Sequence, residues 1–408
     1  MSEPILITGS GMVSAIGTNK ADALNSLLHE QTGIGALKYL KTVHHEFPVG
    51  EVQLSDGQLA ALLGIAPDVP TTRTSLMGML ALREALTEAH LLPDGRSERA
   101  ESVPLRVALV SGTTVGGMDK SEQYYPDFLS NDSRNAYIAT HDCGACTEMI
   151  ADHFGIFSFV SSISTACSSA ANALVEAANL IRDGRFDIVV AGGSECLTKF
   201  HLNGFNSLML LERRLCRPFD RDRAGLNLGE GAGYLVLETA RSAAQRGVAP
   251  VGLFAGYGNS CDAFHQTASS DDGEGAFLAM RKALADAGLE PADIDYINAH
   301  GTGTVNNDAS ETEALKRVFG NRLPPVSSTK SFTGHTTSAS GAIESVICLL
   351  AMRHGFLPVN LNWQHAMPGG IIPVPDKHTD RPLRHVLCNS FGFGGNDTSL
   401  VFSNPSRS

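Results

Sequence analysis

A cysteine stands where a predicted strand gives way to a predicted helix. Cys167 follows the stretch 159–166, which is rich in β-branched and small residues, and precedes the Ala- and Leu-rich stretch 168–182. The first-turn N–H groups and the dipole of such a helix stabilise a thiolate. The position therefore predicts a nucleophile, whereas each of the other seven cysteines is expected to be a small buried hydrophobic residue.

Two histidines and a lysine also follow predicted strands. His300 comes after the predicted strand 295–299 and is followed by two closely spaced glycines. His335 comes after the predicted strand 326–328, with Lys330 five residues before it. Ligands of open α/β sheets bind beyond the carboxyl ends of the strands. We therefore expect these side chains and the cysteine to meet in one site.

This combination of residues favours carbon–carbon chemistry on a thioester. A cysteine with one histidine is a nucleophile with an acid/base partner. Two neutral imidazoles that donate N–H groups to one oxygen form a hole for an oxyanion or an enolate. Metal binding by Cys167, His300 and His335 is the alternative, but they include no closely spaced ligand pair. We expect no metal site.

Apolar β-branched runs alternate with amphipathic runs along the chain, which indicates βαβ units and mainly parallel sheets. Strands are predicted at 5–8, 106–111, 159–163, 187–191, 234–238, 251–256, 295–299, 326–328, 386–389 and 399–402. Helices are predicted at 20–28, 75–89, 168–182, 275–287, 310–319 and 341–353. The polar stretch 241–250 is interpreted as a linker. We expect two similar halves, at 1–245 and 246–408.

Four motifs resemble the signatures of the β-ketoacyl-[acyl carrier protein] synthases, in that family's order. They are 165–169, 300–304, 330–335 and 389–396. The chain is most similar to the type II elongating branch of the thiolase superfamily, and the resemblance covers its whole length. It implies an α/β fold, a five-layered αβαβα sandwich of two similar halves with mainly parallel mixed sheets.

The resemblance implies roles for the residues in these motifs. Cys167 would accept the acyl group. His300 and His335 would promote decarboxylation of a malonyl thioester and stabilise the enolate. The backbone N–H groups of Cys167 and Phe393 would form the oxyanion hole, and the Phe393 side chain would gate the acyl pocket.

Further roles follow from the same resemblance. Lys330 would hold the second histidine and its hydrogen-bond network, with Glu344 as the partner of the lysine. Thr302 and Thr304 would meet a phosphopantetheine arm. Two aromatic side chains are expected against the substrate: Phe205 and Phe391.

Two segments depart from the family pattern. Asn396-Asp397 stands where the family commonly has Thr-Asn, and 336–338 is bulkier and more polar than the family's small residues. We expect both segments to make the acyl pocket more polar. A polar lining favours short, unsaturated or functionalised acyl groups, because each buried CH₂ gains less than the ~0.8 kcal/mol of an apolar slot.

The expected reaction is the decarboxylative Claisen condensation of an acyl-enzyme thioester with malonyl-[acyl carrier protein], in fatty acid or polyketide/polyene-type synthesis. No resident cofactor is expected, since phosphopantetheine arrives on the acyl carrier protein. The alternative is a non-catalytic partner subunit of the chain-length-factor type, which usually lacks the nucleophile that is present here. A homodimer is expected, and a heterodimer with a related subunit stays open.

Composition excludes several other classes of protein. The 408 residues include 31 Lys+Arg and 43 Asp+Glu, and a formal net charge of −12 argues against nucleic acid. No apolar stretch is long enough to span a bilayer, and residues 1–4 lack the basic start of a signal peptide. We therefore expect a soluble, cytoplasmic protein without a disulfide framework.

Three other motifs each have both a functional and a structural interpretation. The glycines in 9–14 suggest a dinucleotide site, but Ser14 occupies the place of the third glycine, and a tight strand-to-helix turn is preferred. Cys143 and Cys146 form a lone CxxC, interpreted as the start of a helix near the pocket or a dimer interface. The arginines in 213–223 either contact an acidic carrier protein or brace a loop.

Overall fold

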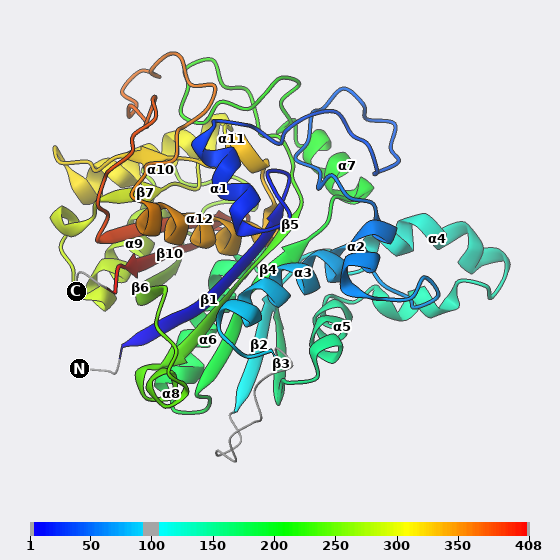
Figure 1. The fold of residues 1–408 in the computed structure, drawn as a ribbon. Coiled ribbons are helices and arrows are strands. Elements are labelled where there is room, and N and C mark those ends of the chain that lie inside the picture. Colours follow the sequence, from blue (N-terminus) through cyan, green and yellow to red (C-terminus); the bar gives the residue numbers. More distant parts are fainter. Residues whose placement is uncertain (1–3, 93–105, 406–408) are drawn as a thin grey trace.

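The computed structural model describes residues 4–92 and 106–405 (Figure 1). Within these ranges the strands are β1 Ile5–Ser14, β2 Val107–Gly112, β3 Phe159–Ile163, β4 Ile188–Glu195, β5 Gly231–Thr239, β6 Gly252–Cys261, β7 Tyr296–Asn298, β8 Val326–Ser327, β9 His385–Gly392 and β10 Asn396–Ser403. Each overlaps one of the ten predicted strands, and β3 has the predicted bounds. The first three residues, on which the argument about a signal peptide partly rests, lie outside the described ranges.

The helices of the described ranges are more numerous than predicted. They are α1 Lys20–Leu28, α2 Asp56–Leu63, α3 Arg73–Glu88, α4 Met118–Ser130, α5 Cys143–Phe154, α6 Ser169–Arg182, α7 Lys199–Ser207, α8 Ala240–Arg246, α9 Glu274–Ala287, α10 Val305–Phe319, α11 Lys330–Thr333 and α12 Ser340–His354. Short 3₁₀ turns are η1 Asn135–Thr140, η2 Pro291–Asp293 and η3 Thr337–Ala339. All six predicted helices are present, and α8 occupies the stretch predicted as a linker.

The strands form one mixed sheet whose order repeats. The first half runs β3-β2-β4-β5-β1 and the second, read from its far edge, runs β8-β7-β9-β10-β6. The halves join where β1 pairs with β6 over residues 5–7. This repetition agrees with duplication of one α/β unit, while the boundary at 245/246 stays a prediction.

Parallel pairing is less extensive than expected. Among the described strands, β2 pairs in parallel with β3 and β4, and β7 with β8 and β9. The other five pairs are antiparallel. Strands β9 and β10 are joined by a loop of only three residues, 393–395, which an antiparallel pair permits and a parallel pair does not. Apolar runs reveal burial on both faces but not strand direction.

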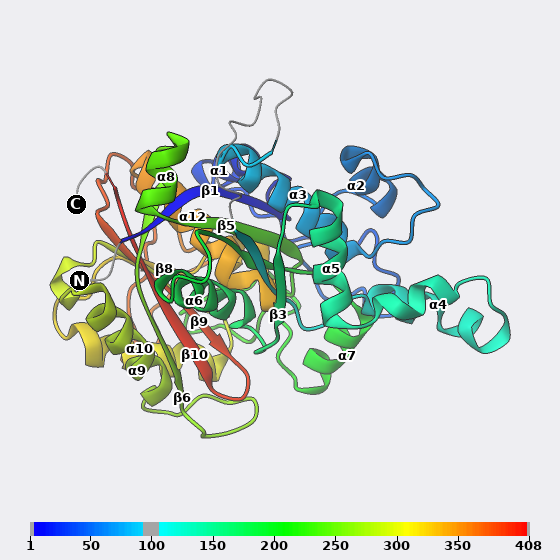
Figure 2. The same ribbon diagram turned by 90° about the horizontal axis from the view of Figure 1, so that it is seen from below.

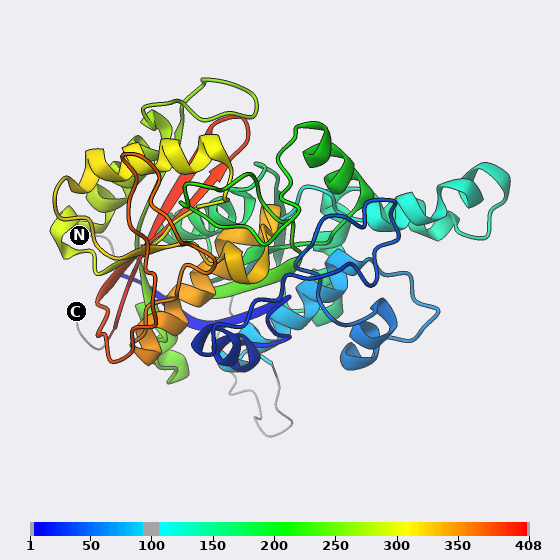
Figure 3. The ribbon, with the colours of Figure 1, turned by 90° about the horizontal axis from the view of Figure 1, so that it is seen from above.

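Helices α6 and α12 form the central layer, between the strands of the two halves (Figure 2). Helices α3 and α5 cover the outer face of the first half, and α9 and α10 cover that of the second (Figure 3). Separate apolar clusters fill the central layer and the two outer layers. This is the five-layered αβαβα arrangement expected from the sequence.

The glycines near the N-terminus serve packing rather than a turn. Strand β1 continues through Gly9 and Gly11 to Ser14, so the turn expected at these glycines is wrong. A Cβ at Gly9 would lie 2.2 Å from the carbonyl oxygen of Ala85, and one at Gly11 would lie 2.1 Å from that of Ala81. Their absence lets α3 approach the strand closely.

No helix in the described part of the chain is long and apolar enough to cross a lipid bilayer.

Candidate active site

Cys167 lies in the turn between β3 and α6. Ala166 adopts a φ of 51°, in the left-handed region that residues other than glycine seldom occupy. Hydroxyl groups hold the turn: Ser168 Oγ donates to the carbonyl of Thr165 (2.7 Å), and Ser169 Oγ donates to that of Ala166 (2.6 Å). These bonds fix a strained turn that places the sulfur just before the first residue of α6.

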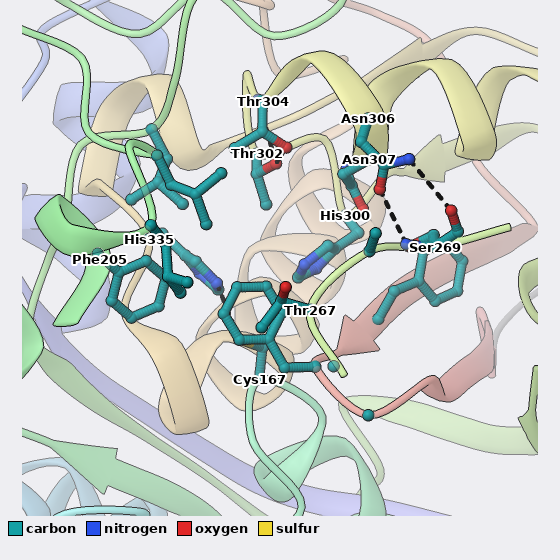
Figure 4. Close-up of a pocket in the computed structure, with 18 of the residues that line it drawn as sticks. Cys167, Phe205, Thr267, Ser269, His300, Thr302, Thr304, Asn306, Asn307 and His335 are labelled. Carbon is teal, nitrogen blue, oxygen red and sulfur yellow. Dashed lines mark hydrogen bonds between the residues drawn. The ribbon is translucent and has the colours of Figure 1, made fainter. Parts of the chain in front are cut away.

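Both histidines meet this sulfur in one buried place. His335, between α11 and η3, has its Nε2 atom 3.1 Å from Cys167 Sγ. His300, in the loop between β7 and α10, stands edge-on to His335, with ring centroids 5.3 Å apart and an interplanar angle of 85°. Figure 4 shows the three side chains around the same cavity. The cysteine thus meets two histidines that are each more than 100 residues away in the chain, as expected from their positions at strand ends.

Burial sets the protonation of the site. It lowers the pKa of His300 and of His335 well below the ordinary value, and the charge of Lys330 acts in the same direction. Both imidazoles are therefore neutral near pH 7. Burial raises the pKa of Cys167 to about 11, against the lowering effects of Lys330 and the Phe393 N–H group. The expected thiolate is therefore not the resting form, because desolvation of the buried sulfur outweighs these lowering effects.

The Phe393 backbone lies at this sulfur. Phe393 belongs to the loop between β9 and β10, and its backbone N–H group acts on Cys167 to lower the pKa of the thiol. Gly394 and Gly395 next to it have φ values of 82° and 77°. The Phe393 ring stacks on Phe205 of α7, with centroids 5.6 Å apart. The loop thus presents an N–H donor on one side and an aromatic wall on the other.

The cavity has a volume of about 180 Å³. Eight of the residues singled out from the sequence line it: Cys167, Phe205, His300, Thr302, Thr304, His335, Phe391 and Phe393. Sequence reasoning missed others: Leu208, Leu210, Leu226, Thr267, Ala268, Ser269, Asn306 and Asn307. The loop 262–270 carries no motif that would have revealed it.

Lys330 and Glu344 lie outside the cavity lining as a buried ion pair. Lys330 Nζ is 2.5 Å from Glu344 Oε1, and the side chains are 1% and 3% exposed. Burial raises the pKa of Glu344 to about 7, although Lys330 opposes that shift. The lysine acts on both histidines through its charge rather than through a side-chain contact that the structure records.

Removal of Glu344 should therefore destabilise the protein strongly. In Glu344→Ala, Lys330 keeps a buried charge without a partner, which typically costs about 3–5 kcal/mol. Urea unfolding measures the loss. Glu313→Ala is the matched control, since its pair with Lys316 is exposed and is worth less than about 1 kcal/mol. Equal losses in the two variants would contradict this account.

A second buried carboxylate positions the first histidine. Glu311 of α10 accepts hydrogen bonds from the backbone N–H groups of His300 (2.9 Å) and Gly301 (2.8 Å) and from the Asn389 side chain (3.1 Å). It ties the loop after β7 to β9. No local motif marked this residue, because its partners lie in other elements.

The two departures from the family pattern do not line the cavity. Ser338 Oγ donates to Glu195, and Asn396 Oδ1 accepts a hydrogen bond from the side-chain amide of Asn172 (2.7 Å). Asp397 is buried against Gly275 at the start of α9. The expected polar acyl pocket is therefore wrong, because these side chains face neighbouring elements. The prediction that the enzyme prefers short or functionalised acyl groups rested on that polar lining and loses this support.

The remaining motifs have structural roles. Helix α5 begins at Cys143, and Cys146 is buried beside Thr72. Among the described residues, no group of His, Cys, Asp or Glu side chains is arranged to hold a metal ion, and these two cysteines are no exception. Arg223 is buried and donates to the carbonyls of Thr304 (3.2 Å) and Val305 (2.7 Å). It braces the start of α10.

Comparison with known proteins identifies the class. Residues 2–243 match the N-terminal domain of β-ketoacyl synthases, and residues 251–364 match the C-terminal domain. The chain therefore belongs to the β-ketoacyl synthase family, has a thiolase-like fold and is a condensing acyltransferase.

Particular relatives span the whole chain. Nodulation protein E of Rhizobium meliloti is 34% identical over 98% of this chain and 99% of its own. The 3-oxoacyl-[acyl-carrier-protein] synthase 2 of Synechocystis is 31% identical over 98% and 97%. Among solved structures, the ishigamide ketosynthase/chain length factor superposes with a TM-score of 0.89 at 30% identity, covering 99% of this chain and 100% of that one.

Proposed function

We propose that this enzyme condenses an acyl group held on Cys167 with malonyl-[acyl carrier protein] to give 3-oxoacyl-[acyl carrier protein]. The observation that carries the proposal is the contact of 3.1 Å between Cys167 Sγ and His335 Nε2, beside a second neutral histidine in one cavity. Two neutral imidazoles at a buried thiol fit stabilisation of an enolate better than thioester hydrolysis, which needs one histidine.

The first half-reaction loads the cysteine. Cys167 Sγ attacks the thioester carbon of the acyl carrier, and the pantetheine sulfur leaves with the thiol proton. The N–H groups of Cys167 and Phe393 receive the oxyanion that forms in between. Because Phe393 stacks on Phe205, the ring must turn aside to admit a long acyl chain, so it acts as the gate.

The second half-reaction forms the carbon–carbon bond. The malonyl thioester loses CO₂, and N–H groups of His300 and His335 receive the charge on its oxygen. The enolate carbon then attacks the acyl carbon on Cys167, and the sulfur leaves as a thiolate that takes a proton from water to restore the thiol. Thr302 and Thr304, which line the cavity, would contact the phosphopantetheine arm.

We propose an acyl carrier protein as the partner, as the name of the Synechocystis relative states for that enzyme. The arm on the carrier makes a resident cofactor unnecessary. Exposed Arg213 and Arg214 follow the cavity-lining Leu210 closely and would attract an acidic carrier to an otherwise negative protein. Eight free cysteines fit a reducing cytoplasm.

We propose a homodimer. The similarity to a ketosynthase/chain length factor makes pairing with a related subunit the alternative, which native mass spectrometry would decide. Cys167, His300 and His335 argue that this chain is the catalytic member in either assembly. The condensation serves fatty acid or polyketide-type synthesis.

A panel of acyl carrier proteins tests the proposal and identifies the substrate. Carriers with short saturated, long saturated and polyunsaturated acyl groups are each incubated with the enzyme and malonyl carrier, and intact carrier masses are measured. We expect a carrier mass that corresponds to the acyl group extended by one 3-oxo unit, with at least one acyl class. Omission of malonyl carrier is the control. No extension with any member of the panel would overturn the proposal.

A further inference from the structure

The turn that follows His335 is strained. Thr337 has a φ of 45°, which β-branched residues rarely adopt. Its buried hydroxyl oxygen has no hydrogen-bond partner among the described residues. Such a conformation persists only where its surroundings hold it, and it is typical of active sites. The hydroxyl groups of this turn, predicted to face the acyl chain, therefore need another explanation.

A buried carboxylate holds the turn in place. Glu195, the last residue of β4, is fully buried and accepts a hydrogen bond from Ser338 Oγ. It also accepts hydrogen bonds from the Thr113 hydroxyl (2.9 Å) and the Thr114 N–H group (2.8 Å). Charge-assisted bonds of this kind are stronger than neutral ones. The turn is thereby tied to the loop after β2.

The same turn delivers a hydroxyl group to the ring of His335. Ser340, the first residue of α12, is fully buried, and its Oγ lies 3.0 Å from Nδ1 of His335. Thr336 Oγ1 lies 3.3 Å from the same Ser340 oxygen. The other ring nitrogen, Nε2, faces Cys167. A neutral imidazole carries one N–H group, so the bond at Nδ1 decides which nitrogen holds the proton.

We propose that Ser340 is a positioning residue that donates its hydroxyl hydrogen to Nδ1 of His335 and so keeps the ring proton on Nε2. The Thr336 hydroxyl donates to the Ser340 hydroxyl, so each hydroxyl group in this chain of hydrogen bonds donates toward the His335 ring. The bond between Ser338 and Glu195 holds the strained turn that places Ser340. The inference rests on the proposed function, in which Nε2 donates to the enolate oxygen.

Ser340→Ala tests this role, because it removes the donor and leaves the ring proton free to occupy either nitrogen. We expect kcat for malonyl-thioester decarboxylation to fall about three- to tenfold, the net effect of one hydrogen bond, with KM unchanged. Acylation of Cys167 is expected to fall less than decarboxylation, because the N–H groups of Cys167 and Phe393 receive the oxyanion of that step. Ser340→Thr retains the hydroxyl group and should restore decarboxylation.

Ser345→Ala is the matched control. Ser345 is also buried on α12, and its hydroxyl group donates to the carbonyl of Gly341, so both half-reactions should keep wild-type rates. If Ser340→Ala fails to fold, Ser340→Cys preserves the size with a weak donor and should lower the same kcat. A wild-type rate of decarboxylation in Ser340→Ala would overturn the role of Ser340. If Ser340→Ala does not fold, a wild-type rate in Ser340→Cys would do the same.

His335→Ala in the same assay separates this inference from the proposed function. If His335→Ala keeps decarboxylation, the proposed function itself is wrong. If His335→Ala loses decarboxylation and Ser340→Ala keeps it, only the role of Ser340 is overturned.

Discussion

Cys167→Ala should abolish acylation of the enzyme and, with it, all formation of 3-oxoacyl product. The side chain is 5% exposed and its replacement removes one sulfur atom, so the fold should survive. Intact-mass measurement after incubation with an acyl carrier protein gives the result directly. Cys388→Ala is the matched control, since Cys388 is equally buried but lies outside the cavity. An acyl group gained by the Cys167→Ala protein would contradict the assignment of the nucleophile.

His300→Ala and His335→Ala should each lower malonyl-thioester decarboxylation by about 10²–10³, the usual loss for one oxyanion donor. Both rings are neutral because burial and Lys330 lower their pKa, so each offers an N–H group rather than a charge. Acylation of Cys167 should continue in both variants at a reduced rate.

Release of CO₂ from carboxyl-labelled malonyl carrier measures the effect on each histidine variant. His153→Ala is a suitable control, because that histidine lies on α5, outside the cavity lining. Loss of acylation with decarboxylation retained would reverse the roles given to the histidines and the cysteine.

Much of this architecture was predictable from local pattern. Strand β3 and helix α1 have the predicted bounds, and all ten strands occur where apolar runs were noted. The site was predictable because His300 and His335 follow strands, and strand ends of such a sheet meet at one edge. The four motifs then located the residues that face the cavity.

The rest depends on contacts between distant elements. Glu311 and Glu195 show no local signal, since their partners lie on other strands and loops. Residues 336–338 follow His335 in the chain, which places them near the acyl pocket, but adjacency in sequence does not reveal which way a side chain points. Similarly, the helix N-terminus at Cys167 predicted a thiolate, whereas the depth of burial, known only from the fold, raises its pKa.

The central claim is that Cys167 holds the acyl group while the enolate formed by decarboxylation makes the new carbon–carbon bond. A single-turnover experiment tests this claim most directly. Enzyme acylated on Cys167, located by peptide mass mapping, is mixed with carboxyl-labelled malonyl carrier protein. We predict that the acyl mass leaves the enzyme in step with CO₂ release, one for one, and reappears on the carrier as the 3-oxoacyl group. Acyl group released as free acid, or CO₂ released while the acyl group stays on the enzyme, would contradict the account.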